Sequence, residues 1–130
     1  MDDREWQKTF HVLAASARLV LLIPSDSPGT VWEINWLKGK GLFNKTIFIM
    51  PHINDAQTLA QGQFDVEQHW EKTSRTLLEW GLGMPQYSAD GMFFSLGQDG
   101  RLLRSVRMNA GWGTFAKNIQ TLLRDLSITI

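Results

Sequence analysis

Residues 25–30 carry the side chains best suited to bind a small anion. They lie between an aliphatic run and a predicted helix, and the unpaired N–H groups at a helix N-terminus favour phosphate or carboxylate. Ser25, Ser27 and Thr30 add hydroxyl groups. Gly29 lets the backbone approach a ligand closely. The segment therefore predicts an anion or nucleotide site, and the alternative is that Ser27 only caps the helix.

Glu33 is the candidate for acid–base or electrostatic chemistry. It follows Ser27 by six residues, roughly two turns into the predicted helix. Its neighbours are large and apolar: Val31, Trp32, Ile34 and Trp36. Burial among such side chains raises the pKa of a carboxylate and lets it stabilise positive charge or accept a proton. The alternative is a solvated glutamate near a helix N-terminus, where the helix dipole favours it.

The aromatic and histidine side chains near this segment each allow two interpretations. Trp32 and Trp36 stand at i and i+4, a spacing typical of core packing, with a stacking platform for a base or nicotinamide ring as the alternative. His52 follows the second apolar run, where it would either hydrogen-bond a ligand or lie in a surface loop. His11 and His69 have no second ligand at helical spacing, so no metal site is predicted.

The first half of the chain predicts a helix, a strand, a second helix and a second strand. Asp2 or Asp3 can cap the first helix. The aliphatic run over residues 18–24 predicts a strand buried on both faces, the pattern of a parallel sheet. Residues 28–38 predict a helix and residues 45–51 a second buried strand, which together form a right-handed βαβ unit. The buried face of the first helix is predicted to comprise Trp6, Phe10, Leu13, Ala14 and Ala17.

The second half predicts a helix, a hairpin and a last helix. Asp65 can start the third helix, and Gly-Gln-Asp-Gly at 97–100 joins two strand-like runs at 91–96 and 102–108. The element order predicts a three-layer α/β/α sandwich with a mixed sheet of about four strands, of the flavodoxin type. The buried side of the third helix is predicted to be Val66, Trp70, Thr73, Leu77 and Trp80, and that of the last helix Phe115, Ile119, Leu122, Leu123 and Leu126.

Composition restricts the class of protein. The 130 residues predict a single domain, and 13 basic and 13 acidic side chains give zero net charge, which offers no support for nucleic-acid binding. No cysteine is present, which excludes disulfides and thiol nucleophiles. No apolar run is long enough for a membrane segment and the start is acidic, so we expect a cytoplasmic chain. Residues 100–130 carry a balance of +4, which predicts a solvated basic face or, alternatively, a patch that faces phosphate or a partner.

Part of the chain resembles a Toll/interleukin-receptor (TIR) domain, and more closely the TIR-like domains of uncharacterised bacterial proteins, some attached to membrane segments. The resemblance covers roughly residues 5–51, about a third of the chain. The pattern is Trp6-x3-Phe10-x2-Leu13-x3-Ala17-x2-Val20-Leu21-Leu22-Ile23-Pro24-Ser25, then Ser27-x5-Glu33, then Lys45-Thr46-Ile47-x-Ile49-x-Pro51. In family members that cleave NAD at the nicotinamide–ribose bond, the glutamate six residues after the serine is catalytic, and the resemblance implies that role for Glu33.

The chain also departs from the family pattern. The tryptophan four positions before the glutamate is replaced by Gly29, and Trp32 stands next to Glu33 instead. The family's opening strand and its second strand with the ligand-gating loop have no counterpart, and residues 84–130 do not follow the pattern. We therefore expect either a piece of a longer protein or a shortened relative.

Two functional hypotheses follow from these observations. The first is an interaction or signalling module that self-associates, binds a protein partner, or binds a nucleotide without turnover. The alternative is an NAD glycohydrolase, and NAD is the one small molecule named for either hypothesis, as ligand or as substrate. In it Glu33 would stabilise the oxocarbenium-like ribose. Its phosphate site would comprise Ser27, Gly29 and Thr30, with Trp32 beside the nicotinamide.

Overall fold

A mixed four-stranded sheet forms the centre of the computed structural model, which describes residues 3–52 and 65–107. The strands are β1 (Val20–Leu22), β2 (Thr46–Met50), β3 (Met92–Leu96) and β4 (Leu102–Arg107), in the order β1-β2-β3-β4. β1 pairs with β2 in parallel, whereas β3 is antiparallel to both β2 and β4. The predicted α/β class, parallel pair and hairpin are therefore confirmed.

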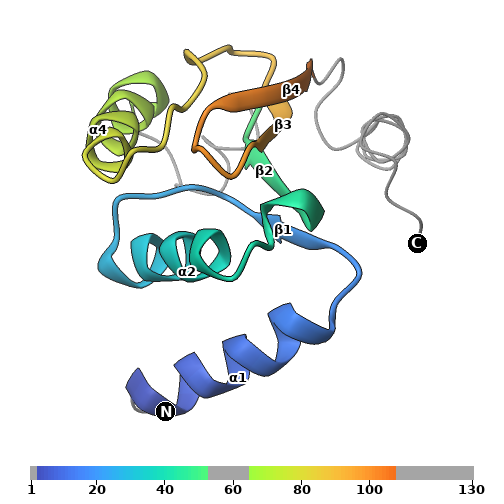
Figure 1. The fold of residues 1–130 in the computed structure, drawn as a ribbon. Helices are drawn as coiled ribbons and strands as arrows, with labels where there is room; N and C mark the ends of the chain where they lie inside the picture. The colour runs from blue at the N-terminus through green and yellow to red at the C-terminus, as the bar shows by residue number, and fades with distance from the viewer. Residues whose placement is uncertain (1–2, 53–64, 108–130) are drawn as a thin grey trace.

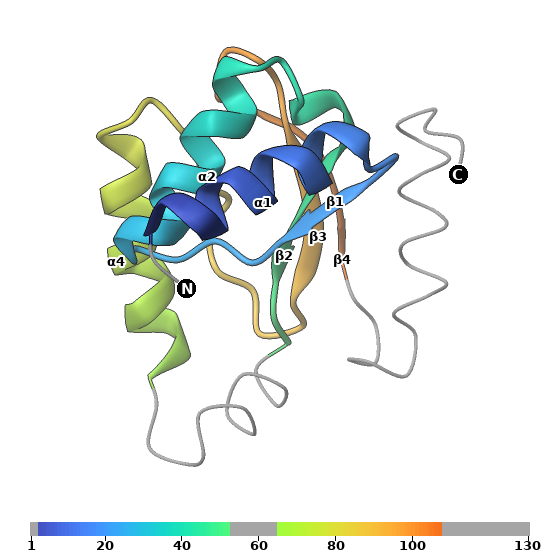
Figure 2. The ribbon, with the colours of Figure 1, turned by 90° about the horizontal axis from the view of Figure 1, so that it is seen from below.

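The described helices lie on one side of this sheet (Figures 1 and 2). They are α1 (Asp3–Ser16), α2 (Pro28–Gly39), the short 3-10 helix η1 (Phe43–Lys45) and α4 (Val66–Leu78). α2 and α4 cover one face of the sheet, and α1 packs against α2 (Figures 1 and 2). The helix predicted around residues 115–126 lies outside the described residues.

The hydrophobic core lies between the sheet and the two covering helices. Leu22, Phe48, Met50, Phe94 and Leu96 extend from the strands and contact Val31, Ile34 and Leu37 of α2 and Trp70 and Leu77 of α4. All five residues of β2 are buried, as the continuous apolar run predicted. The same prediction for the first strand was wrong. β1 is an edge strand of the described sheet, and Leu21 in the middle of β1 is 43% exposed.

Two predicted core positions also proved exposed. Leu13 is 64% exposed because α1 turns the side of Phe10 and Ala14 toward the rest of the protein, which leaves Leu13 at the edge of the contact. Trp80 is 54% exposed because α4 ends at Leu78, before the helical pattern reaches it. The other predicted buried positions of α4 are confirmed: Val66, Trp70, Thr73 and Leu77.

Candidate functional site

The predicted anion-binding segment forms a well-capped helix start. Ser27 is the N-cap of α2 in extended backbone conformation, and its Oγ accepts a hydrogen bond from the backbone N–H of Thr30 at 3.4 Å. Pro28 occupies the first turn, where its missing N–H loses no helical bond. The backbone N–H of Val31 donates to the carbonyl of Ser27 at 3.0 Å. The serine–proline cap predicted from the sequence is therefore confirmed, and its side chain already occupies the Thr30 N–H, one of the free groups that an anion would need.

The three hydroxyl groups of the segment bond to one another. The Oγ atoms of Ser25 and Ser27 lie 3.0 Å apart, and the Ser27 hydroxyl donates to Thr30 Oγ1 at 2.9 Å. The structure thus brings together all three hydroxyls that sequence reasoning selected. Next to them, Asp26 forms a salt bridge with Lys72 of α4 at 3.4 Å. The opposite charges of this pair cancel, so the pair adds no positive charge for an anion beside the hydroxyl cluster.

Gly29 and Trp32 face α1. A Cβ added at Gly29 would lie 3.7 Å from the Trp6 ring. The Trp32 ring makes edge contacts with the rings of Trp6 and Phe10 at centroid distances of 5.2 and 5.8 Å, and it stacks on His11 at 5.3 Å. These contacts support packing against α1 for Trp32, since His11 of α1 already stacks on one face of its ring.

Glu33 is half-buried, in agreement with the prediction that its apolar neighbours desolvate it. Burial raises the pKa of its carboxyl group above the ordinary value of 4.5. Within the described part of the chain, Glu33 has neither a hydrogen-bond nor a salt-bridge partner. A desolvated carboxylate without a partner retains its capacity to bind a positive charge or a proton.

Glu33→Gln is expected to stabilise the protein at pH 7. Because the folded-state pKa of Glu33 is raised, its contribution to stability falls as the pH rises above 4.5 through that pKa, and glutamine removes this penalty. Urea unfolding at pH 4 and pH 7 tests the effect. The gain over wild type should be larger at pH 7, and Glu71→Gln at an exposed position of α4 controls for the loss of one negative charge. An equal gain at both pH values would show that Glu33 is not desolvated.

His52 lies at the same edge of the sheet as the serine cluster. β1 and β2 run in parallel, and Ser25 and His52 each follow their strand by a few residues. The His52 backbone packs tightly against Gly91, where an added Cβ would come within 2.6 Å of the His52 backbone nitrogen. Gly91 has a φ of +73°, a backbone conformation that residues with a side chain rarely adopt. The end of β2 is therefore held by backbone contacts, and no described contact joins His52 to Glu33.

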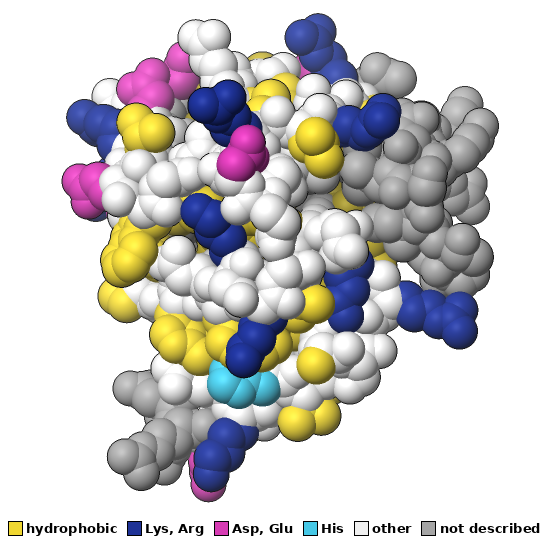
Figure 3. Space-filling model, viewed as in Figure 1, with side chains coloured by type: hydrophobic (Ala, Val, Ile, Leu, Met, Phe, Trp, Pro, Cys, Tyr) yellow, Lys and Arg dark blue, Asp and Glu magenta, His cyan; other side chains and the backbone are white. Residues whose placement is uncertain are grey.

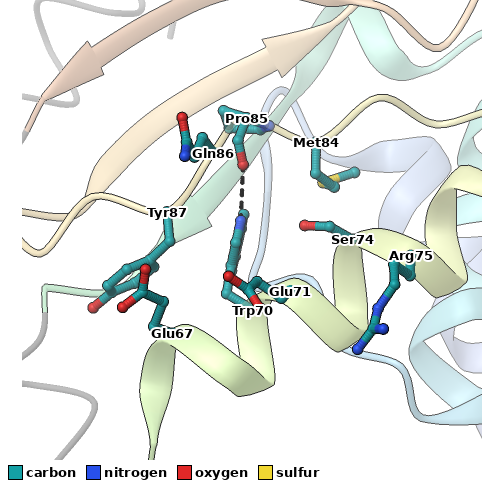
Figure 4. Close-up of a pocket in the computed structure, with 9 residues that line it drawn as sticks. All are labelled: Glu67, Trp70, Glu71, Ser74, Arg75, Met84, Pro85, Gln86 and Tyr87. Atoms are coloured by element: carbon teal, nitrogen blue, oxygen red, sulfur yellow. Dashed lines mark hydrogen bonds between the residues drawn. The ribbon is translucent and has the colours of Figure 1, made fainter.

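A pocket elsewhere in the molecule was not predicted from the sequence. It has a volume of about 430 Å³ and lies between α4 and the segment 84–87 (Figure 4). Its lining comprises Glu67, Trp70, Glu71, Ser74, Arg75, Met84, Pro85, Gln86 and Tyr87. The signal available in the sequence was the polar face of α4, where Glu67, Glu71 and Arg75 recur every four residues. The opposite wall of the pocket, residues 84–87, could not be predicted from helical spacing, because these residues follow the helix along the chain.

Comparisons with models of protein families, with curated proteins and with solved structures found no match. Among the helices that the structure describes, none has the length and apolar character needed to cross a membrane.

Proposed function

We propose that the chain is a TIR-like interaction module that self-associates through the exposed face of α1 and does not turn over NAD. The observation that carries this proposal is an apolar surface at α1. Val12 lies on this face and is 66% exposed. Val12 also lines a hollow of about 580 Å³, together with His11, Ala15, Trp36, Lys40 and Leu42, which we call the α1 hollow. Figure 3 shows apolar side chains along the seam between α1 and α2.

A second copy of the chain is the occupant that the charge balance favours. The 13 basic and 13 acidic side chains cancel, so copies of the chain do not repel one another through net charge near neutral pH. Exposed apolar side chains grouped beside a hollow are typical of protein contact surfaces. Burying Val12 of one copy in the α1 hollow of another would remove both from water.

The contacts around the serine cluster support the absence of turnover. A glycohydrolase needs an exposed ring platform and free donors for phosphate, whereas Trp32 contacts α1 and the hydroxyls of Ser27 and Thr30 bond to each other. Neither the α1 hollow nor the pocket beside α4 is lined by Glu33. These observations favour the interaction module over the enzyme.

Val12→Lys is expected to weaken self-association by about tenfold or more, because it places a charge in a buried apolar contact. Light scattering after size-exclusion chromatography, over a concentration series, measures the effect. Leu78→Lys is the matched control, since Leu78 on α4 is 64% exposed and lies away from the α1 hollow. Wild-type protein that stays monomeric at millimolar concentration would disprove the proposal, as would an equal effect of both substitutions.

The glycohydrolase alternative retains one specific observation in its favour, the half-buried and unpartnered Glu33 carboxylate. Purified protein incubated with NAD, with nicotinamide measured by chromatography, separates the two functions. The interaction module predicts the same background release from wild type and Glu33→Ala. Release by wild type that Glu33→Ala abolishes would establish the enzyme instead.

A further inference from the structure

The pocket between α4 and the segment 84–87, the α4 pocket, combines an apolar wall with an acidic rim. Trp70, Met84 and Pro85 form the wall, and Trp70 is only 4% exposed. Glu67 and Glu71 stand one helical turn apart on α4 (Figure 4). A volume of about 430 Å³ lies in the range of small-molecule sites.

Two hydroxyl groups in the α4 pocket have no hydrogen-bond partner among residues 3–52 and 65–107. They are Ser74 Oγ and the Tyr87 hydroxyl, and both are buried. By contrast, the Trp70 indole N–H donates to the carbonyl of Pro85 at 2.8 Å. This bond fixes the Trp70 ring, which stands between the Ser74 and Tyr87 side chains (Figure 4). Because buried polar atoms are nearly always paired in folded proteins, two unpaired hydroxyls in one pocket point to a polar ligand group.

The charges of the α4 pocket favour a cation. Glu67 and Glu71 outnumber Arg75, so the lining carries a balance of −1. Glu71 and Arg75 form no salt bridge in the described structure, although they stand four residues apart. Glu67 lies close enough to the Tyr87 ring to help raise the pKa of that phenol, after the larger effect of burial. The negative field is thus concentrated at the end of the pocket where Tyr87 lies.

We propose that the α4 pocket binds a small organic cation with an apolar body. The ammonium group lies between Glu67 and Glu71, at the end of the pocket where the Tyr87 hydroxyl lies (Figure 4), and donates to that oxygen. The apolar body packs on Trp70 and Met84. Carboxylates, an aromatic ring and hydroxyl acceptors around one cavity are the groups that recognise an amine. This site shares no residue with the α1 hollow, so it stands or falls independently of self-association.

Two probes of nearly equal shape test the proposal, 2-phenylethylamine and 2-phenylethanol. The amine is expected to bind at least about fivefold more tightly than the alcohol, because only the amine carries the positive charge. Isothermal titration calorimetry measures both affinities, and the nuclear magnetic resonance shift of the Trp70 indole N–H locates the site. Equal affinities would overturn the proposal, as would binding that leaves the Trp70 signal unmoved.

Substitutions then separate specific recognition from general attraction to an acidic surface. Glu71→Gln is expected to weaken amine binding by about threefold to tenfold, whereas Glu79→Gln, exposed at the end of α4 and outside the pocket, is expected to leave it unchanged. Ser74→Leu would fill part of the cavity and should abolish binding, with circular dichroism to verify the fold. Equal losses from both glutamine variants, or full binding by folded Ser74→Leu, would contradict the assignment.

Discussion

Gly100→Ala is expected to lower the free energy of unfolding by about 3 kcal/mol. Gly100 lies in the turn between β3 and β4 with a φ of +83°, and an alanine there costs about 1–2 kcal/mol in backbone conformation alone. A Cβ at this position would come within 2.0 Å of the Gly81 carbonyl oxygen, and relief of such overlap costs about 1–3 kcal/mol more. Urea unfolding should show a lower midpoint with an unchanged m-value.

Gly39→Ala is the matched control for this substitution. Gly39 ends α2, and an added Cβ would meet no atom within 4 Å. Alanine should therefore raise stability by up to about 1 kcal/mol through its better helix propensity. If Gly100→Ala proved as harmless as Gly39→Ala, the close approach between the hairpin turn and the segment after α4 would be wrong.

The hairpin turn also positions the α4 pocket. The backbone N–H of Gly83 donates to the Gly100 carbonyl at 2.8 Å, one residue before the pocket wall begins at Met84. A substitution that pushes the turn away from Gly81 would therefore move that wall. Loss of amine binding in Gly100→Ala would follow from this displacement, so the variant cannot serve to map the ligand itself.

The elements that local chemistry determines were predicted well from the sequence. Ser27 and Asp65 were identified as helix starts because their side chains accept hydrogen bonds from the first turn, and both are N-caps in the structure. The continuous apolar run of β2 and the Gly-Gln-Asp-Gly turn were equally informative, because burial on both faces and a tight reversal each leave a local signature.

The features that depend on distant contacts were not predictable in the same way. Helical spacing placed Leu13 in the core, but the aromatic contacts of α1 with α2 turn His11 inward instead, stacked 4.5 Å from Trp36. The residues of β1 likewise gave no sign that it is an edge strand, because its place in the sheet depends on which strands pair with it. The α4 pocket needs residues 67–75 and 84–87 together, and the hydrogen bond from the Trp70 indole N–H to the Pro85 carbonyl joins these two segments.

Trp70→Ala is expected to destabilise the protein by about 3–5 kcal/mol, the usual effect of removing a buried tryptophan. Trp70 is 4% exposed and makes an edge contact with Phe94 at a centroid distance of 6.1 Å. Trp70→Phe should cost less, about 1–3 kcal/mol, because it keeps a ring against Phe94 but leaves the buried Pro85 carbonyl without its donor. Urea unfolding of both variants measures the two contributions.

Trp80→Ala provides the control for tryptophan content. Trp80 is 54% exposed, so its loss should change stability by no more than about 0.5–1 kcal/mol. The graded series separates two contributions of Trp70. The difference between phenylalanine and alanine reports the packing of one ring, and the difference between tryptophan and phenylalanine reports the bond to Pro85 together with the lost volume of the second ring. If phenylalanine were neutral, the bond would not hold the segment 84–87 against α4. The α4 pocket would then lack the fixed wall on which its recognition of a cation depends.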